Sequence, residues 1–245
     1  MHPVIPLWVT LLIVSANIIV PILAWRAFQK VARRSAPRLI APGFGFFAVW
    51  VLLALALSIR GFFAPSASLG VPRIAWALLP LAIGYAAYLT VRSVREVVDR
   101  IPLDRIIGLQ IYRALGVVFL VEWMLGAMPG AFALPAAIGD IAIGVTAPWI
   151  AARVRAGAPR AQGAAVLWNV LGIADLVVAI GTGVLTAPGA LHLLSPDFPN
   201  VAITMMPLVL VPTISLPLSF LLHLIGLHRI AASMQPTAFD FSRAT

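Results

Sequence analysis

Apolar runs long enough to cross a membrane recur along the whole chain. A bilayer core about 30 Å thick needs about 20 consecutive, mostly apolar residues in a helix. Segments of this kind lie near 4–25, 40–59, 74–92, 106–127, 132–151, 164–187 and 202–227. Most of them are apolar all round rather than along one helical stripe, so we expect lipid to be their solvent. The pattern predicts an all-α membrane protein with seven transmembrane helices.

The connections between these segments are short and rich in turn-forming residues, as in Ala-Pro-Ser-Ala-Ser-Leu-Gly at 64–70 and in the stretch 188–200. None is long enough for a soluble domain. We therefore expect residues 1–234 to form a single transmembrane domain and residues 235–245 to form a short polar tail. The first apolar run is not expected to be a cleaved signal peptide, because its basic residues follow it.

Composition supports a lipid environment. Hydrophobic residues make up 62% of the 245 residues and charged residues 10%, against about 45–50% and about 25% in soluble domains. The formal charge of +9 does not indicate nucleic-acid binding, because membrane proteins concentrate Lys and Arg in cytoplasmic loops. The chain has no cysteine, which excludes disulfides, thiolate metal sites and a cysteine nucleophile.

Basic residues divide unequally between the two ends of the predicted bundle. Fourteen of the 17 fall at one end, at positions 26, 30, 33, 34, 38, 92, 95, 100, 105, 153, 155, 160, 229 and 243. The opposite end has only Arg60 and Arg73, and Arg113 lies inside the fourth segment. This asymmetry predicts a cytoplasmic arginine-rich end, an N-terminus outside, a C-terminus in the cytoplasm and a multi-pass location in the cell's inner (plasma) membrane.

Seven helices in this orientation also permit a weak 3+1+3 parallel repeat, in which two three-helix units are joined by a linker helix. Aligning Trp50 with Trp168, and Pro80 with Pro212, gives a consistent order. Pro207, Pro212 and Pro217 all fall in the last segment, where each removes a backbone donor. The carbonyls that lose a donor either are satisfied by neighbouring helices or line a hinge or a site.

Polar groups at membrane depth are the candidate site residues, since an ionisable side chain there is costly and calls for a partner. The candidates for ligand or proton binding are Gln110, Arg113, Glu122, Asp140, Trp168, Asn169, Asp175 and His223. At a rise of about 1.5 Å per residue, Gln110, Arg113, Asn169 and His223 form an inner layer. Glu122 and Asp140 form an outer layer, with Asp175 near the middle.

Helical spacing relates some of these residues. Gln110 and Arg113, three apart, share a face, whereas Arg113 and Glu122, nine apart, point in nearly opposite directions, which excludes an ion pair between them. Trp168 and Asp175 share a face. Glu122 lies about five residues from a helix end, so its carboxylate is in reach of the membrane interface by snorkelling.

Several chemistries are unfavourable. A lysine-linked retinal is excluded, because the only lysine, Lys30, lies in a loop. Haem would have a single suitable ligand, His223, so no cofactor is predicted. His223 and His228 do not share the face that metal chelation requires, and we predict no metal site. No catalytic residue is identified either, since Ser219 and His223 have no group to orient them, and a non-enzyme is favoured.

Three short motifs resemble a family of uncharacterised bacterial polytopic membrane proteins of about seven helices. They are Ile-Gly-Leu-Gln at 107–110 with Arg113, Trp168-Asn169, and Leu222-His223. The likeness spans residues 106–230. In that family a more polar segment precedes the aspartate that matches Asp140, where this chain has Phe-Ala-Leu-Pro-Ala-Ala-Ile-Gly at 132–139. The resemblance implies a bacterial inner membrane and no established activity.

Three hypotheses of function follow. The first is a small-molecule or proton-coupled transporter, or a ligand sensor, in which Asp140 and Asp175 bind protons, Arg113 holds an anionic group, and Asn169 and His223 complete an inner gate. The second is a non-enzymatic accessory subunit of a membrane complex, whose polar groups only pack helices. The third is a membrane-embedded redox or lipid enzyme. Expected partners are the bilayer, a small ligand and either a homo-oligomer or a complex partner, without nucleic acid.

Overall fold

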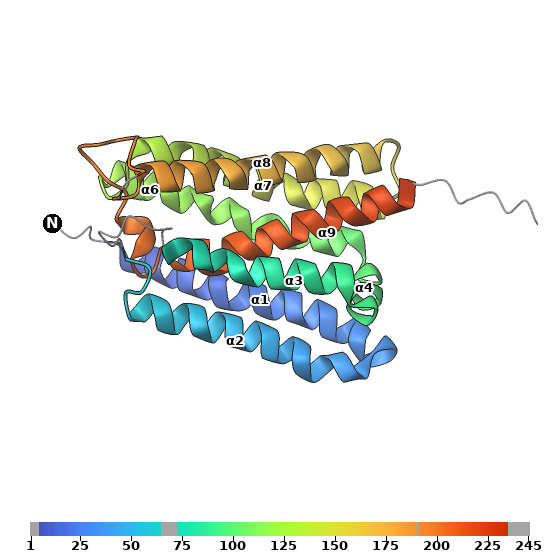
Figure 1. Ribbon diagram of the computed structural model, residues 1–245. Helices are drawn as coiled ribbons and strands as arrows, with labels where there is room; N and C mark the ends of the chain where they lie inside the picture. The colour runs from blue at the N-terminus through green and yellow to red at the C-terminus, as the bar shows by residue number, and fades with distance from the viewer. Residues whose placement is uncertain (1–4, 65–72, 190, 235–245) are drawn as a thin grey trace, which may run out of the picture.

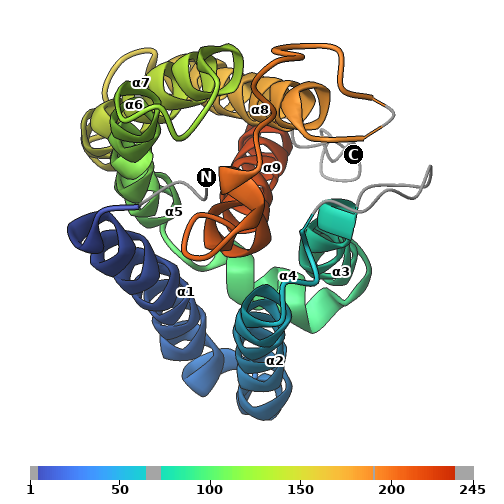
Figure 2. The same cartoon turned by 90° about the vertical axis from the view of Figure 1, so that its left-hand side faces the viewer.

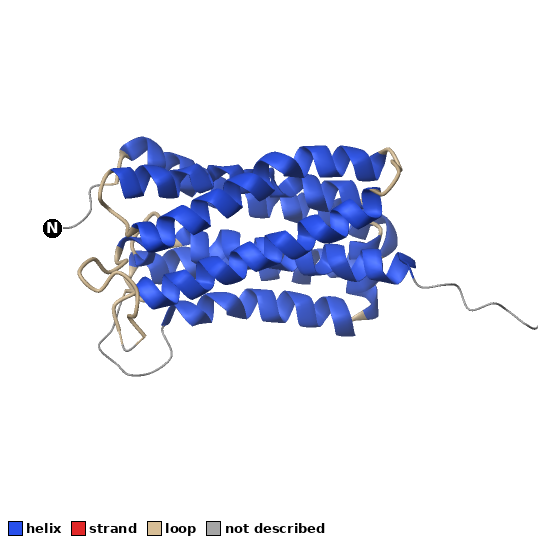
Figure 3. Ribbon diagram, turned by 90° about the horizontal axis from the view of Figure 1, so that it is seen from above, coloured by secondary structure: helices blue, strands red, loops and turns tan. Residues whose placement is uncertain are grey.

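The protein is an elongated bundle of helices that run roughly alongside one another (Figures 1 and 3). The computed structural model describes residues 5–64, 73–189 and 191–234, and within these ranges there is no β-strand. Seven helical spans are long and apolar enough to cross a membrane. The predicted all-helical class and the seven spans are therefore confirmed.

The elements follow in chain order, with η marking 3₁₀ or π turns. They are α1 (Leu7–Ser35), η1 (Pro37–Leu39), α2 (Ile40–Ile59), η2 (Arg73–Leu78), α3 (Leu79–Thr90), α4 (Arg92–Asp99), α5 (Leu103–Leu109), η3 (Gln110–Gly116), α6 (Val117–Met124), α7 (Gly130–Arg155), α8 (Ala161–Thr186), η4 (Ala202–Thr204), η5 (Val211–Ser215) and α9 (Leu216–Met234).

Several helix boundaries differ from those expected. The first span continues to Ser35 and includes basic residues that were assigned to a loop, because a helix can extend beyond the bilayer; its expected start at residue 4 lies outside the described residues. The last span begins at Val211 rather than at residue 202. The helix does not extend back to residue 202, because the backbone of Met205 is extended and Pro207 has no backbone N–H to donate. The tail at 235–245 also lies outside the described residues.

The last helix is the centre of the bundle. Seen from one end, α9 stands between α7 and α8 on one side and α1, α2 and α3 on the other (Figure 2). In the most apolar part of its span 50% of the residues are buried, against 11% in the corresponding part of the α2 span and 11% in that of the α3 span. Few residues of α2 and α3 are thus fully buried. The C-terminal helices build the interior.

A proline-freed carbonyl fastens α2 to this central helix. Pro217 has no N–H, so the carbonyl of Thr213, four residues earlier, lacks its usual helical donor. The indole Nε1 of Trp50 donates a hydrogen bond of 2.9 Å to that oxygen. The preceding residues, Val211–Ser215, form a π turn. At this position, the expectation that a neighbouring helix satisfies the freed carbonyl is confirmed.

The backbones of α7 and η3 approach closely at Gly144. A Cβ placed there would overlap the backbone nitrogen of Ala114 in η3, and a backbone atom has no flexible end that can move aside. Gly163 of α8 offers a matched position, since a Cβ there would meet nothing within 4 Å.

The orientation of the bundle in the membrane and the internal 3+1+3 repeat stay predictions.

We predict that Gly144→Ala destabilises the bundle and that Gly163→Ala does not. The added methyl at 144 forces α7 away from η3, whereas at 163 it only improves helix propensity by up to about 1 kcal/mol. The measurement is the thermal midpoint of each purified variant in detergent, followed by size-exclusion chromatography. Equal midpoints for the two variants would contradict the close approach of α7 and η3.

Candidate functional site

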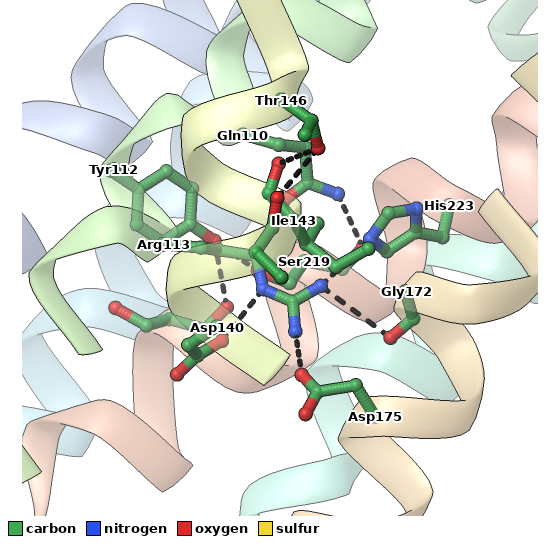
Figure 4. A network of polar contacts seen from close by, with 12 residues as sticks. Gln110, Tyr112, Arg113, Asp140, Ile143, Thr146, Gly172, Asp175, Ser219 and His223 are labelled. Carbon is green, nitrogen blue, oxygen red and sulfur yellow. Dashed lines mark hydrogen bonds and ion pairs between the residues drawn. The ribbon is translucent and has the colours of Figure 1, made fainter. Parts of the chain in front are cut away.

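A single buried arginine joins four helical elements near the middle of the bundle. Arg113, from η3, donates through Nε to Oδ1 of Asp140 in α7 at 2.7 Å and through Nη2 to Oδ2 of Asp175 in α8. Its Nη1 bonds Nε2 of His223 in α9 at 2.9 Å and lies 3.4 Å from the carbonyl of Gly172 (Figure 4). The arginine side chain is only 1% exposed. Every guanidinium nitrogen therefore has a protein acceptor.

The hydrogen bonds around His223 select one form of its ring. A guanidinium can only donate, so Nε2 of His223 must be the acceptor and carry no proton. Nδ1 then bears the hydrogen and donates to Oδ1 of Asn169 at 2.9 Å. The amide of Asn169 in turn donates to the carbonyl of Ala165 at 2.8 Å. The histidine is thus a neutral relay between Arg113 and Asn169.

A short run of 3₁₀ helix aligns the fourth span with its neighbours. The buried residues of η3 are Gln110, Arg113 and Gly116, every third residue. Three residues per turn place such positions directly above one another, whereas an α-helix would turn them progressively away. The predicted shared face of Gln110 and Arg113 is confirmed. It extends to Gly116, which meets Asp140.

A glycine on a neighbouring helix lies against each polar partner of the network. A Cβ at Gly116 would overlap Asp140, one at Gly139 would overlap Asp175, and one at Gly172 would overlap the ring of His223. A Cβ at Gly226 would lie 2.9 Å from Oδ1 of Asn169, which is also too close. Because helices can come this close only at glycine, the sequence provides room for each buried polar group.

The candidate residues divide into those that converge and those that do not. Arg113, Asp140, Asp175, His223 and Asn169 form one connected network, so the two separate layers expected from depth are corrected to a single cluster. The reason is the length of the arginine side chain, which reaches from its own level to both aspartates. These five residues are called the Arg113 network below.

Trp168 and Gln110 border this network without joining it. The ring of Trp168 lies 4.9 Å from that of His223, centroid to centroid, and its Nε1 donates to Oγ1 of Thr146 at 3.0 Å. Gln110 donates to the backbone carbonyl of Ser219 at 3.1 Å. Both residues therefore hold the surroundings of the network in place.

Glu122 lies apart from the Arg113 network. Its residue is 0% exposed, so the expected snorkelling of its carboxylate to the interface is wrong, because the packing of α6 encloses it. Within the described part of the chain, neither carboxylate oxygen has a hydrogen-bond partner. The absence of an ion pair between Arg113 and Glu122 agrees with the spacing argument.

Two polar residues of the surroundings were not selected from the sequence. Tyr112 donates to the carbonyl of Ser215 at 2.9 Å and its hydroxyl also contacts Oγ of Ser219. Asn17, in α1, accepts a hydrogen bond of 2.8 Å from Oγ of Ser215. The position of Tyr112 beside Arg113 was a usable signal. That of Asn17 was its isolation as a polar residue in an apolar helix.

A cavity of about 200 Å³ opens from the Arg113 network toward the arginine-poor end. Arg113, Asp140, Tyr112, Asn17 and Ser215 are among its polar lining residues. Its walls are otherwise mainly apolar and continue past α8 to the segment before η5. Asp140 is the more accessible carboxylate, with 18% of its side chain exposed against 9% for Asp175.

A second cavity, of about 290 Å³, lies between α1, α2, α3, α5 and α9. Apart from Tyr88 and Arg105 its lining is apolar, and no member of the Arg113 network borders it. In the described residues no group of three metal-binding side chains occurs. At His223 a haem iron would have to displace a hydrogen bond, since both ring nitrogens are engaged.

The family model described as "Domain of unknown function (DUF8737)" matches residues 71–231 of the chain. The match includes every residue of the Arg113 network and the cavity walls contributed by α7, α8 and α9. No curated protein and no solved structure matches. The resemblance to an uncharacterised family without an established activity is confirmed.

We predict that Arg113→Ala lowers the free energy of unfolding by about 3–5 kcal/mol, because it leaves two buried carboxylates without their counter-charge. The control is Arg92→Ala, which removes an arginine that is 92% exposed and paired with Glu96, and whose effect should be far smaller. Unfolding in mixed detergent micelles measures both. A neutral triple variant, Arg113→Met with Asp140→Asn and Asp175→Asn, should recover much of the loss. Equal losses in the two arginine variants would contradict a charge-paired core.

Proposed function

The chain belongs to the DUF8737 family, for which no activity is described, and we propose from its geometry that this multi-pass membrane protein is a proton-coupled small-molecule transporter or ligand sensor whose site is the Arg113 network. The observation that supports the proposal is the ratio of charges in that network. One buried guanidinium is shared by two carboxylates, and one of these borders a cavity.

The charge count leaves one carboxylate in surplus. Arginine is always protonated in proteins, and His223 is neutral in the observed hydrogen-bond arrangement. With both aspartates ionised the network therefore has a net charge of −1. A net charge enclosed by apolar helices is costly, and a single proton on Asp140 or Asp175 removes it. The network is accordingly suited to bind and release one proton.

The same guanidinium couples proton binding to the arrangement of the helices. A proton on either aspartate weakens one of the two ion pairs that join η3 to α7 and α8. Arg113 and Asp140 both line the cavity, so an occupant would lie beside the same ion pair. Both events therefore act on one side chain, which is the physical basis of coupling between two ligands.

We predict that the wild-type protein has a protonated carboxyl group at neutral pH that both Asp140→Asn and Asp175→Asn lose. Each substitution leaves one arginine with one carboxylate, so no proton is needed for neutrality. Infrared difference spectra between neutral and alkaline pH detect the carboxylic-acid carbonyl band in bilayer-reconstituted protein. Asp104→Asn, which removes a carboxylate near the arginine-rich end, is the matched control and should keep the band.

The variant Glu122→Gln shows whether any carbonyl band comes from the isolated Glu122 carboxyl group rather than from the Arg113 network. A band that persists in both Asp140→Asn and Asp175→Asn and disappears only in Glu122→Gln would contradict the proposed proton site. The accessory-subunit role predicts that neither aspartate substitution changes the spectrum. A cluster that only packs helices has no need for an exchangeable proton.

The proposed orientation places the arginine-rich end in the cytoplasm and the cavity mouth outside, in the cell's inner membrane. The distribution of fourteen basic residues against two supports it. In transport terms, the 200 Å³ cavity is then the outward-facing compartment, and the side of the network nearer His223 faces inward.

We predict opposite labelling of two single-cysteine variants, which are simple to make because the natural chain has no cysteine. Leu193→Cys lies at the arginine-poor end, where Leu193 is 71% exposed, and Ser35→Cys ends α1 beside Arg34. A membrane-impermeant maleimide applied to spheroplasts should label Leu193→Cys at once. Ser35→Cys should react only after permeabilisation. The reverse pattern would overturn the orientation.

A further inference from the structure

Resting on the proposed function, we infer that the 200 Å³ cavity binds a small, mostly apolar organic cation, such as a protonated primary amine, whose ammonium group pairs with Asp140 in place of the exchangeable proton. Three independent features of the cavity lead to this ligand class. They are the protein acceptors bound by each nitrogen of Arg113, the oxygen of Asp140 that Arg113 does not bind, and the protein acceptors bound by the neighbouring donor groups.

Arg113 has little to offer an anion. Its Nε, Nη1 and Nη2 all bond protein acceptors, and its side chain is 1% exposed. An anionic ligand would have to displace Asp140 or Asp175, and it would add a third negative charge to one positive charge. The anions held by Arg113 are thus the protein's own aspartates, in place of the ligand anion expected from the sequence.

Asp140 provides an open acceptor on the cavity wall. Its Oδ1 accepts a hydrogen bond from Arg113, and within the described residues no hydrogen bond reaches Oδ2. The side chain is 18% exposed and lines the cavity. A carboxylate oxygen in this position accepts a hydrogen bond and attracts a positive charge.

The neutral polar groups of the cavity are also short of free donors. The hydroxyl of Tyr112 donates to the carbonyl of Ser215, and that of Ser215 donates to Asn17. One N–H of the Asn17 amide donates to the carbonyl of Ile13 at 2.9 Å. The cavity therefore presents mainly acceptor oxygens. A ligand complementary to them brings hydrogen-bond donors of its own.

The walls set the size and character of the rest of the ligand. Phe119 and Phe132 meet edge to face with centroids 5.5 Å apart, and Ile13, Leu176 and Ile180 complete much of the surface. A dry apolar cavity of about 150 Å³ is large enough for benzene. A volume of about 200 Å³ suits one aromatic ring with a short aminoalkyl chain.

Charge balance links this cation to the proton. The network is neutral with one proton bound, and it is again neutral when a monovalent cation replaces that proton. Binding of an ammonium ligand therefore releases one proton from Asp140 or Asp175. The two compete for the same surplus negative charge, which is the elementary requirement for exchange of a proton against an organic cation.

Binding of three matched probes tests the inference: 2-phenylethylamine, the neutral 2-phenylethanol and the anionic phenylacetate. Calorimetric titration of the full-length protein in detergent, repeated in two buffers of different ionisation enthalpy, gives affinity and proton release together. We expect the amine to bind with release of about one proton and the other two probes to bind roughly tenfold more weakly or not at all. Stronger binding of phenylacetate or 2-phenylethanol, or no binding of the amine up to its solubility limit, would overturn the inference.

Two variants and a matched control locate the binding. Asp140→Asn should lower the affinity for the amine by roughly tenfold or more, because the ammonium group loses its carboxylate partner. Asp104→Asn should bind the amine with the affinity of the wild type. Gly183→Leu leaves every charge in place and fills the cavity, since a Cβ at Gly183 meets no atom closer than 3.5 Å and the longer side chain occupies the space beyond it. It should also abolish binding, so the test remains decisive if Asp140→Asn does not fold. Amine binding unchanged in Gly183→Leu would overturn the inference.

The inference and the proposed function fail separately. An exchangeable carboxyl proton in the infrared spectra without preferential amine binding rejects the ligand class and leaves the proton site intact. Absence of that proton rejects the proposed function whichever probe binds.

Discussion

A guanidinium buried among apolar helices requires an acceptor for each of its nitrogens, and much of the C-terminal half of this protein follows from that requirement. Arg113 obtains its acceptors from α7, α8 and α9 at once, so three helices must converge on η3 at one level. Such convergence is possible only if backbones approach closely. Glycines at 116, 139, 144, 172 and 226 allow this approach at the points where a larger residue would collide with the network or with η3.

Irregular backbone contributes to the same geometry. The 3₁₀ run of η3 stacks Gln110 above Arg113, and Pro217, which has no N–H, leaves the carbonyl of Thr213 without its usual helical donor. Trp50, Tyr112 and Gln110 supply donors to the carbonyls of Thr213, Ser215 and Ser219 respectively. In a membrane, where water cannot replace a missing hydrogen bond, these contacts hold peripheral α2 and the fourth span against the central helix.

The network differs from a purely structural ion pair in its stoichiometry and its position. A balanced pair would hold the helices together with no net charge, whereas a second carboxylate adds a surplus that a proton or a cation must neutralise. Asp140 lies at the boundary between this dry cluster and an open cavity. The charge surplus and the accessible volume therefore meet at one carboxylate, which is the physical argument for function over packing alone.

Much of the architecture was decided by the sequence because it depends on properties that are local to each segment. Length and hydropathy determine the seven spans, and depth along a helix follows from residue number, so the concentration of costly polar groups in helices four to seven could be predicted. The same holds for the face shared by Gln110 and Arg113, which are three residues apart.

Only the tertiary structure decided which of those groups meet, because the rotation of each helix about its axis depends on its neighbours and on the local change from α to 3₁₀ winding. Depth alone placed Arg113 and Asp140 in different layers, and the reach of one long side chain joined them. It also placed Glu122 near the interface, and the packing of α6 enclosed it instead. The roles of Tyr112 and Asn17 depend on contacts with Ser215, which lies about a hundred and about two hundred residues away in the chain, and no local pattern encodes such pairings.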